Sequence, residues 1–346
     1  MTTIYDIAKA AGVTATTVSY ALSGKGSISK ATRARVLKYA REMGYRPNLV
    51  ARSLIKQQTS TIGLVLPKLI NPFYAEIAET AERIAYASGY RVSVTNTYED
   101  ERLGQELLED LASRRVDGII AMPEGLSWQA VHSMTTSGLP LVCCMWEEEE
   151  EEAAAPAVGL DFARGGWLAG EHLLELGHRR IGIVAHGTEG GRLNHHLRVA
   201  GCSAALAHAG YPLDPALLKF GNSTLESGAA AAQALLSLPD PPTAIFATND
   251  LMAIGVIHTA WKMGMHVPRD LSVVGFDDIV LAAYMAPPLT TVAVDIGALA
   301  RKAMELVFSM IEGRQTTSPP LLVPTLKVRG STAPPGEEAF APDLKD

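Results

Sequence analysis

The chain has 346 residues, of which 47% are hydrophobic, and it carries a formal net charge of −7. This length and apolar content allow two or three domains with hydrophobic cores and exclude a chain that is disordered throughout. No charged segment followed by an apolar one begins the sequence, and no apolar run is long enough to span a membrane, so we expect a cytoplasmic protein. Cys143, Cys144 and Cys202 lack metal-ligand spacing and are expected to be core thiols.

The charge is distributed unevenly along the chain. Residues 1–60 hold ten of the 30 Lys and Arg residues but only two of the 37 acids, which leaves 20 basic and 35 acidic residues for the remainder. A basic arm on an acidic body is typical of a nucleic-acid-binding module attached to another domain.

Residues 4–22 predict two short helices joined by a tight turn. Their sequence is IYDIAKAAGVTATTVSYAL, in which apolar residues recur at helical spacing on either side of Gly12. Thr14 is placed to cap the second helix, because its hydroxyl can accept a hydrogen bond from a free backbone N–H. The helix behind it carries short or hydroxyl-bearing side chains and can enter a DNA major groove. A two-helix hairpin of any α-helical domain is the alternative, and the basic charge favours a helix-turn-helix.

A third helix is predicted after Ser29, which is a suitable cap, and it ends at Gly44. Pro47 then begins a segment, PNLVARSLIKQQ, with helical composition but few side chains to bury. Because an isolated short helix is marginal in water, this segment must gain its stability from a partner.

The chain resembles the lactose-repressor (LacI/GalR) family of bacterial transcription regulators. The resemblance lies in three motifs in the family's order and spacing, TIYDIAKAAGVTATTVSYAL, GYRPNLVARSL and TIGLVLP, and it extends to about residue 330. It implies that the helix after Ala15 lies in the major groove and that residues 48–56 fold on DNA as a hinge helix. Leu54 would then wedge between base pairs in the minor groove, a contact that kinks DNA by unstacking a step. Ordinary packing of a linker helix is the alternative for Leu54.

From Ser60 onward, apolar runs alternate with helical stretches in two successive sets. This pattern predicts parallel sheets covered on both faces. The predicted fold class is an N-terminal all-α helix-turn-helix domain followed by an α/β two-lobed body of doubly wound parallel sheets, similar to periplasmic binding proteins. The expected strands span residues 62–67, 91–97, 118–122, 139–145, 179–186, 217–222, 243–249 and 271–278. The expected helices span residues 73–88, 101–114, 197–209, 227–238 and 251–263, with another after Asp295.

The resemblance also implies the domain boundaries. These are 1–46 for the helix-turn-helix domain, 47–58 for the hinge helix, 59–160 with 293–322 for the N-terminal lobe, and 161–292 with 323–330 for the C-terminal lobe. The six acids Glu147 to Glu152 are expected to form a solvated loop. Residues 331–346 contain no apolar heptad, so we expect a disordered tail and a dimer rather than a tetramer.

The candidate DNA contacts lie mainly on the second helix. Thr16, Thr17 and Tyr20 are candidates for base or backbone contact, and Ala15 offers a methyl group to a thymine. Thr17 could equally face a phosphate or the domain core. The complete set is Thr3, Tyr5, Thr14, Ala15, Thr16, Thr17, Ser19, Tyr20, Asn48, Ala51, Arg52 and Leu54.

The resemblance implies an effector cleft between the lobes. Phe73 and Tyr74 match aromatic positions that stack on a ligand, Arg198 matches an arginine that binds ligand hydroxyl or carboxylate groups, and Asp277 matches an acid that accepts from hydroxyls. The complete set is Phe73, Tyr74, Trp146, Arg192, Arg198, Asn249 and Asp277.

Structural alternatives stand beside these assignments. Arg198 and Asp277 could bond each other, Asn249 could hold its loop together, and Asp250 could cap the helix that follows. Trp146 could pack in the core or between the lobes.

Catalytic and metal-binding motifs are absent from the sequence, including G-x-S-x-G, the P-loop, G-x-G-x-x-G and H-E-x-x-H. The adjacent His195 and His196 are expected in an exposed loop. We therefore expect no enzyme, no metal and no cofactor.

The predicted function is a dimeric, sequence-specific DNA-binding transcription regulator, most often a repressor in this family. Its expected partners are a palindromic operator in double-stranded DNA and a small effector, a carbohydrate by resemblance. Three alternatives remain open: a soluble small-molecule-binding protein, a corepressor-dependent regulator of the purine type, and a nucleoid architectural protein.

Overall fold

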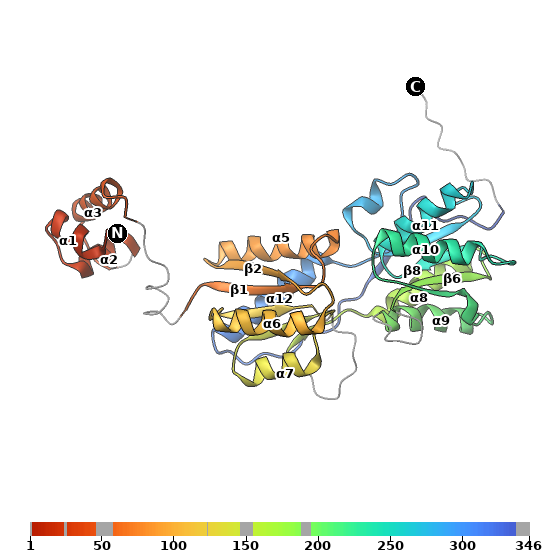
Figure 1. Ribbon diagram of the computed structural model, residues 1–346, viewed down its shortest axis with the longest axis horizontal. Coiled ribbons are helices and arrows are strands. Elements are labelled where there is room, and N and C mark those ends of the chain that lie inside the picture. Colours follow the sequence, from red (N-terminus) through yellow and green to blue (C-terminus); the bar gives the residue numbers. More distant parts are fainter. Residues whose placement is uncertain are drawn as a thin grey trace, which may run out of the picture. The chain divides into compact units, whose positions relative to one another are not determined.

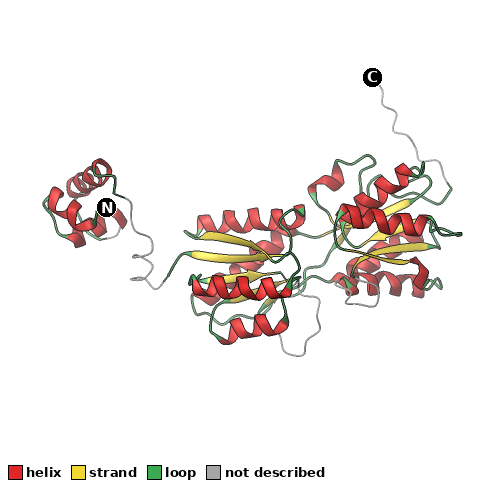
Figure 2. Ribbon diagram, in the orientation of Figure 1, coloured by secondary structure: helices red, strands yellow, loops and turns green. Residues whose placement is uncertain are grey.

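The computed structural model describes residues 2–23, 26–45, 58–122, 124–145, 155–187 and 195–336. The chain divides into two compact units, Met1–Thr59 and Ser60–Asp346. Figure 2 shows that the first unit is helical and that the second contains both helices and strands. No helix in the described ranges has the length and apolarity of a membrane span.

Residues 2–23 and 26–45 of the first unit form three helices, as predicted. Its helices are α1 (Ile4–Ala11), α2 (Ala15–Ser23) and α3 (Lys30–Glu42). The predicted caps are confirmed, because the Thr17 amide donates to the Thr14 hydroxyl at 3.2 Å and the Thr32 amide donates to the Ser29 hydroxyl at 3.1 Å. The small core consists of Ile7, Ala8, Ala11, Val18, Ala21, Val36 and Ala40.

The second unit has two lobes, each built on a sheet with helices on its faces (Figure 1). The sheet of the first lobe has the order β2-β1-β3-β4-β5 and is parallel throughout. Its strands are β1 (Thr61–Leu66), β2 (Arg91–Asn96), β3 (Gly118–Ala121), β4 (Leu141–Cys144) and β5 (Ala157–Val158), and its helices are α5 (Pro72–Ala87), α6 (Glu101–Ser113) and α7 (Trp128–Thr136). All three cysteines are free and buried, as predicted.

The sheet of the second lobe has the order β11-β10-β9-β8-β6-β7, and only the β10–β11 pair is antiparallel. Its strands are β6 (Ile181–His186), β7 (Leu218–Gly221), β8 (Ala244–Ala247), β9 (Ser272–Asp277), β10 (Thr290–Ala293) and β11 (Thr325–Lys327). Its helices are α8 (Phe162–Glu175), α9 (His196–His208), α10 (Leu225–Leu236) and α11 (Asp250–Lys262), with 3₁₀ turns η1 (Pro215–Leu217) and η2 (Val280–Ala283).

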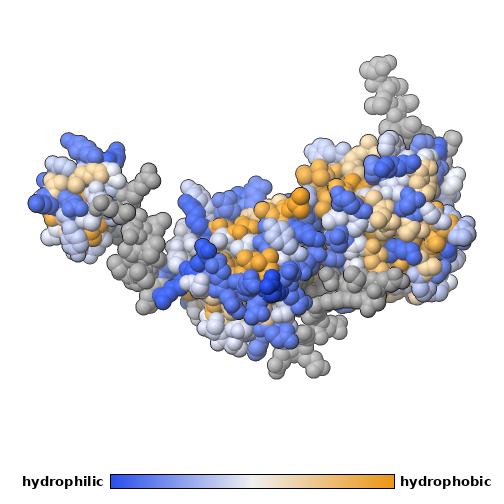
Figure 3. All heavy atoms as spheres, viewed as in Figure 1, coloured by the Kyte–Doolittle hydropathy of each residue, from blue (hydrophilic) through white to orange (hydrophobic). Residues whose placement is uncertain are grey.

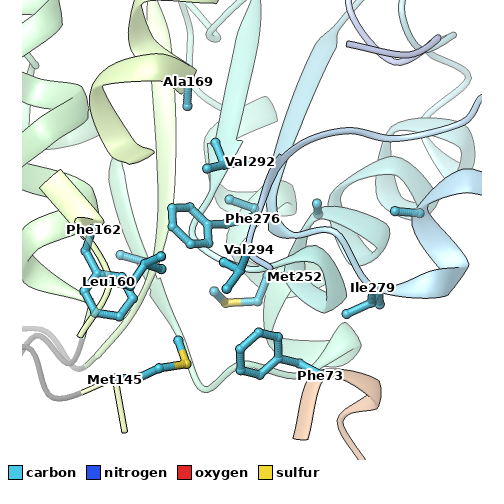
Figure 4. Close-up of a cluster of buried hydrophobic side chains, with 14 of the residues drawn as sticks. Phe73, Met145, Leu160, Phe162, Ala169, Met252, Phe276, Ile279, Val292 and Val294 are labelled. Atoms are coloured by element: carbon cyan, nitrogen blue, oxygen red, sulfur yellow. The ribbon is translucent and has the colours of Figure 1, made fainter. Parts of the chain in front are cut away.

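The chain crosses between the lobes after β5, after β10 and after α12 (Ile296–Ile311). Helix α12 follows the last parallel strand of the second sheet but packs on α5, β3 and β4 of the first lobe. Side chains of both lobes form one buried cluster, in which Figure 4 shows Phe73 and Met145 together with Phe162 and Phe276. The fold class is thus confirmed, while the predicted residue boundaries of the domains stay a prediction.

Two helices were not among the predicted elements, α7 and α8. Helix α8 contains Gly165, Gly166 and Gly170, which lower the helical propensity of the segment. The structure explains one of them, because a Cβ atom on Gly166 would lie 1.9 Å from the backbone oxygen of Arg198 on α9. Tertiary packing therefore requires a residue that local propensity disfavours.

The prediction of a disordered tail is wrong for residues 331–336. Ser331 is fully buried: its hydroxyl donates to the Val273 oxygen at 2.6 Å and accepts from the Thr290 amide at 2.8 Å. Small polar residues can lie against a sheet when their hydrogen bonds are satisfied there, which composition alone does not reveal. Residues 337–346 lie outside the described residues, as does the acidic run 147–152.

Replacing Ser331 with alanine should lower the free energy of unfolding by about 1–2 kcal/mol, because it removes a partner from two buried backbone groups. Urea unfolding measures the change. Ser113→Ala, at an exposed serine on α6, is the control and should change the free energy by less than about 0.5 kcal/mol. Equal effects of the two substitutions would contradict a structural role for this segment.

Candidate functional site

Helix α2 presents an uncharged polar face to solvent. Thr16, Ser19 and Tyr20 are exposed on it, and their spacing of three and four residues places them on one side of the helix. Val18 and Ala21 of the same helix are buried in the domain core. The structure therefore brings three of the candidate DNA contacts together on one accessible surface.

The other candidates of this domain differ in exposure. Ala15 and Thr17 are partly buried, and the Thr17 hydroxyl lies 2.9 Å from that of Thr14, so part of its bonding capacity is used inside the domain. Tyr5 on α1 is 72% exposed. Thr3 caps α1 through a reciprocal pair of hydrogen bonds with Asp6. The hinge candidates Asn48, Ala51, Arg52 and Leu54 lie outside the described residues.

A cavity of about 180 Å³ lies between the two lobes. The lining residues of the first lobe lie beyond the carboxyl ends of β1, β2 and β3, and those of the second lobe lie at or beyond the carboxyl ends of β6, β7 and β8. Ligands of open α/β sheets bind at this edge. The lining residues are Lys68, Ile70, Asn71, Tyr74, Glu99, Glu124, His186, Ser223, Thr224, Leu225, Glu226 and Leu251.

Polar contacts join the lobes across this cavity. Lys68 pairs with Glu99 at 2.7 Å within the first lobe, and its ammonium donates to the backbone oxygen of Asn222 in the second at 3.2 Å. Glu99 also lies 3.5 Å from the ring of His186 in the second lobe. Burial alone would raise the pKa of Glu99, but hydrogen bonds from His186 and Lys68 outweigh burial and lower it. Glu99 is therefore the charged centre of the interlobe contact.

Arg198 of α9 lies in the interior of the second lobe. Its guanidinium carbon is 4.7 Å from the ring centroid of Phe162 and 4.3 Å from that of Phe276, and one nitrogen donates to the Thr248 oxygen at 2.7 Å. Figure 4 shows the two phenylalanine rings in this core. The same nitrogen is 3.8 Å from Asp277, so the alternative in which this pair bonds each other is confirmed.

Asp277 is the last residue of β9 in the second sheet and is almost fully buried. Burial raises its pKa well above the ordinary value, Arg198 opposes that rise, and the nearby Asp250 and Glu124 add to it. Neither Arg198 nor Asp277 belongs to the cavity lining in the part of the chain that the structure describes. Their direct contact with a ligand stays a prediction.

Asn249 and Asp250 have exchanged the structural roles suggested for them. Asn249 is the cap of α11, because its side chain accepts from the Met252 amide at 2.8 Å. Asp250 holds the loop after β9 by accepting from the Ile279 amide at 2.9 Å and from the Thr291 hydroxyl at 2.5 Å. Burial raises the pKa of Asp250 to about 7.

Only one residue of the aromatic pair reaches the cavity. Tyr74 lines it, whereas Phe73 is 2% exposed and belongs to the core, where the two rings meet edge-on with centroids 5.3 Å apart. The expectation that Phe73 stacks on a ligand therefore has no support from its position, because its ring is occupied by core packing. Trp146 and Arg192 lie outside the described residues.

Sequence reasoning missed most of the cavity lining. Lys68, Glu99, Glu124 and Ser223 each follow a strand by two or three residues, and His186 ends one. Their position directly after an apolar run could have identified these residues as cavity lining, because residues that follow parallel strands collect at one edge of the sheet. The described ranges contain no cluster of three or more His, Cys, Asp or Glu side chains suited to a metal ion.

The expectation that His195 lies in an exposed loop is wrong. His195 is buried, and its Nδ1 atom lies 2.9 Å from the Thr248 hydroxyl. Its ring meets that of His186 edge-on at 5.1 Å. Burial lowers its pKa well below the ordinary value, and the charges of Arg198 and His186 lower it further.

Comparisons with known proteins agree with this architecture. The family model for bacterial regulatory proteins of the lacI family matches residues 3–48, and that of the periplasmic binding protein-like domain matches residues 171–332. The HTH-type transcriptional regulator DegA of Bacillus subtilis is 37% identical over 338 residues, which cover 96% of this chain and 98% of DegA.

Solved structures are similar over the same length. A lac repressor dimer bound to operator and the anti-inducer ONPF is 26% identical, with a TM-score of 0.84 and coverage of 96% of this chain and 99% of that one. A LacI family transcriptional regulator from Enterococcus faecium with bound ribose is 30% identical, with a TM-score of 0.71 and coverage of 79% and 99%.

Proposed function

The chain belongs to the lacI family of bacterial regulatory proteins, and from that premise we propose a repressor whose operator affinity is set by a carbohydrate bound between its lobes. A regulator of chromosomal DNA works in the bacterial cytoplasm, which is the compartment we propose. Its relatives are transcription regulators, and the proposal includes no catalysis.

The exposed face of α2 supports the DNA-binding part. Thr16, Ser19 and Tyr20 offer hydroxyl groups, which can bond base edges or phosphates in a major groove. We propose that Ala15 offers its methyl group to a thymine and that Thr3, Tyr5, Thr14 and Thr17 contact the DNA backbone. Asn48, Ala51, Arg52 and Leu54 act in the hinge.

Exposed apolar side chains support a homodimer. Both lobes show apolar patches on the face in Figure 3. Exposed aliphatic side chains include Val94 on the first lobe and the adjacent Val280 and Leu281 on the second. Contiguous apolar patches mark association surfaces, whereas single exposed apolar side chains are normal on any protein. A similar solved structure, the lac repressor bound to operator, is a dimer. A two-fold symmetric dimer would read a palindromic operator.

The observation that carries the effector part is the cavity formed jointly by the two lobes. A ligand that contacts both lobes stabilises one spacing of the lobes relative to another. The ligand changes operator affinity only to the extent that it binds one of these two conformations more tightly than the other. The relative with bound ribose supports a carbohydrate. We propose that the effector releases the protein from DNA, so an effector that tightened operator binding would assign a corepressor instead.

Leu54→Ala should weaken operator binding by about 2–3 kcal/mol, because the smaller side chain cannot wedge into a base step. The operator is first selected from random DNA, and affinity is then measured by fluorescence anisotropy at fixed salt. Val328→Ala, which shortens an exposed apolar side chain of the body, is the matched control and should bind normally. Unchanged affinity of Leu54→Ala would remove the wedge, and failure to select any palindrome would contradict the operator proposal.

A further inference from the structure

The charges around the interlobe cavity do not balance. Lys68 pairs with Glu99, and Arg198 pairs with Asp277. Glu124 also lines the cavity, and no cation among the described residues forms an ion pair with its carboxylate. Glu226 also lines the cavity, but it is exposed to solvent, so Glu124 is the less accessible carboxylate of the described lining that no ion pair neutralises.

The surroundings of Glu124 are costly for a lone negative charge. Burial raises the pKa of Glu124. A backbone hydrogen bond and the charges of His186 and Arg198 only partly oppose the rise, and the charge of Glu99 adds a smaller increase. The pKa of Tyr74 is also raised well above its ordinary value, first by burial and then by the charges of Glu124 and Asp277. A buried carboxylate in a negative field is stabilised most effectively by a positive group placed beside it.

The rest of the lining suits a ligand that carries both an ammonium and hydroxyl groups. The ring of Tyr74 lies in the same lining as Glu124, and an aromatic face beside carboxylates is the usual setting for a bound ammonium. Asn71, Ser223 and Thr224 add amide and hydroxyl groups that can bond ligand hydroxyls.

The size of the cavity limits the ligand. Its volume of about 180 Å³ is smaller than the roughly 300–1,000 Å³ of sites for drug-sized molecules, so it suits one sugar ring rather than two. Ile70, Leu225 and Leu251 supply apolar surface for the faces of such a ring.

We infer that the cleft takes an amino sugar of monosaccharide size, with its ammonium beside Glu124 and the Tyr74 ring and its hydroxyl groups on Asn71, Ser223 and Thr224. This inference rests on the proposed function, which assigns the effector to this cleft. A neutral sugar of the same shape would leave the Glu124 carboxylate without a counter-charge. The site should therefore bind the amino sugar more tightly than the neutral sugar.

The test uses isothermal titration of the full-length protein with matched probes. Glucosamine, galactosamine and mannosamine are each compared with the parent sugar and the N-acetyl derivative, at a pH where the free amine is protonated. The amine that fits should bind at least about tenfold more tightly than its parent sugar, as expected for a charge-assisted hydrogen bond.

Three variants test whether Glu124 causes the preference for the amine over its parent sugar. Glu124→Gln should abolish the advantage of the amine over its parent sugar, because the amide carries no charge to pair with the ammonium. Glu124→Asp, which keeps the charge, should retain a preference for the amine. Glu305→Gln removes an exposed carboxylate from α12, outside the cavity, and is the control that should change neither affinity.

The outcomes separate this inference from the function on which it rests. A parent sugar that binds as tightly as its amine and changes operator affinity overturns the amino-sugar inference and leaves the effector cleft in place. Binding of none of the probes counts against both. Operator titration without ligand tests the DNA-binding part independently in each case.

Discussion

Replacing Arg198 with alanine should lower the free energy of unfolding by about 3–5 kcal/mol, because it leaves Asp277 buried without its partner. The substitution also removes the guanidinium from between the rings of Phe162 and Phe276 and its hydrogen bond to the Thr248 oxygen. Urea unfolding of the full chain measures the loss. A decrease below about 1 kcal/mol, the usual size for a surface ion pair, would contradict the interior position of this pair.

A second substitution and a change of pH test the cause. Arg198→Ala combined with Asp277→Asn should recover part of the loss, because it removes the uncompensated charge and asparagine tolerates the positive φ of 114° at this position. The pKa of Asp277 is already raised, and loss of Arg198 raises it further. The folded single variant then binds a proton that the unfolded chain releases, so its stability falls as pH rises through that pKa. Its deficit relative to the natural chain should therefore be smaller at pH 5 than at pH 8.

Gly201→Ala should destabilise the protein by about 3 kcal/mol, at the upper end for overpacking a core. A Cβ atom there would lie 1.9 Å from the backbone oxygen of Ala163 on α8, and backbone atoms of a packed helix cannot yield as a side-chain end can. The helices cross reciprocally, since a Cβ atom added to Gly166 of α8 would lie at the same distance from the Arg198 oxygen of α9. Separating them would also move Arg198 away from Phe162.

Gly297→Ala is the matched control for this substitution. Its new Cβ atom would meet the far end of the flexible Arg301 side chain at 2.9 Å and would lie 3.4 Å from the Asp295 carboxylate, an ordinary contact distance, and the position lies in the first turn of α12. Alanine has the higher helical propensity, so this variant should be neutral or slightly more stable. A thermal shift as large as that of Gly201→Ala would mean that the close helix crossing is not the cause.

Local sequence was sufficient where the interactions are local. The caps Thr14 and Ser29 bond amides three residues away, so the order of residues alone predicted them. The parallel sheets followed from apolar runs alternating with helical stretches, because a strand covered on both faces needs nearly continuous apolar residues. The family resemblance of the three N-terminal motifs is confirmed by the comparisons.

Local sequence patterns could not assign different roles to adjacent residues with similar chemistry. Phe73 and Tyr74 are both aromatic, yet one ring fills the core and the other lines the cavity, because neighbouring positions on α5 point in different directions. Asn249 and Asp250 could both cap a helix or hold a loop, and only the position of the loop after β9 assigns each role.

The sequence by itself determined the domain order, the helix-turn-helix, the two sets of parallel strands and membership of a regulator family. The tertiary structure alone decided which polar residues meet in the cleft, that His195 is buried, and that Ser331 completes the second lobe. The physical reason is distance along the chain, because caps and periodicity act within one or two turns. Lys68 meets Asn222 only when both lobes have folded, and Arg198 meets Asp277 only when the second lobe has folded.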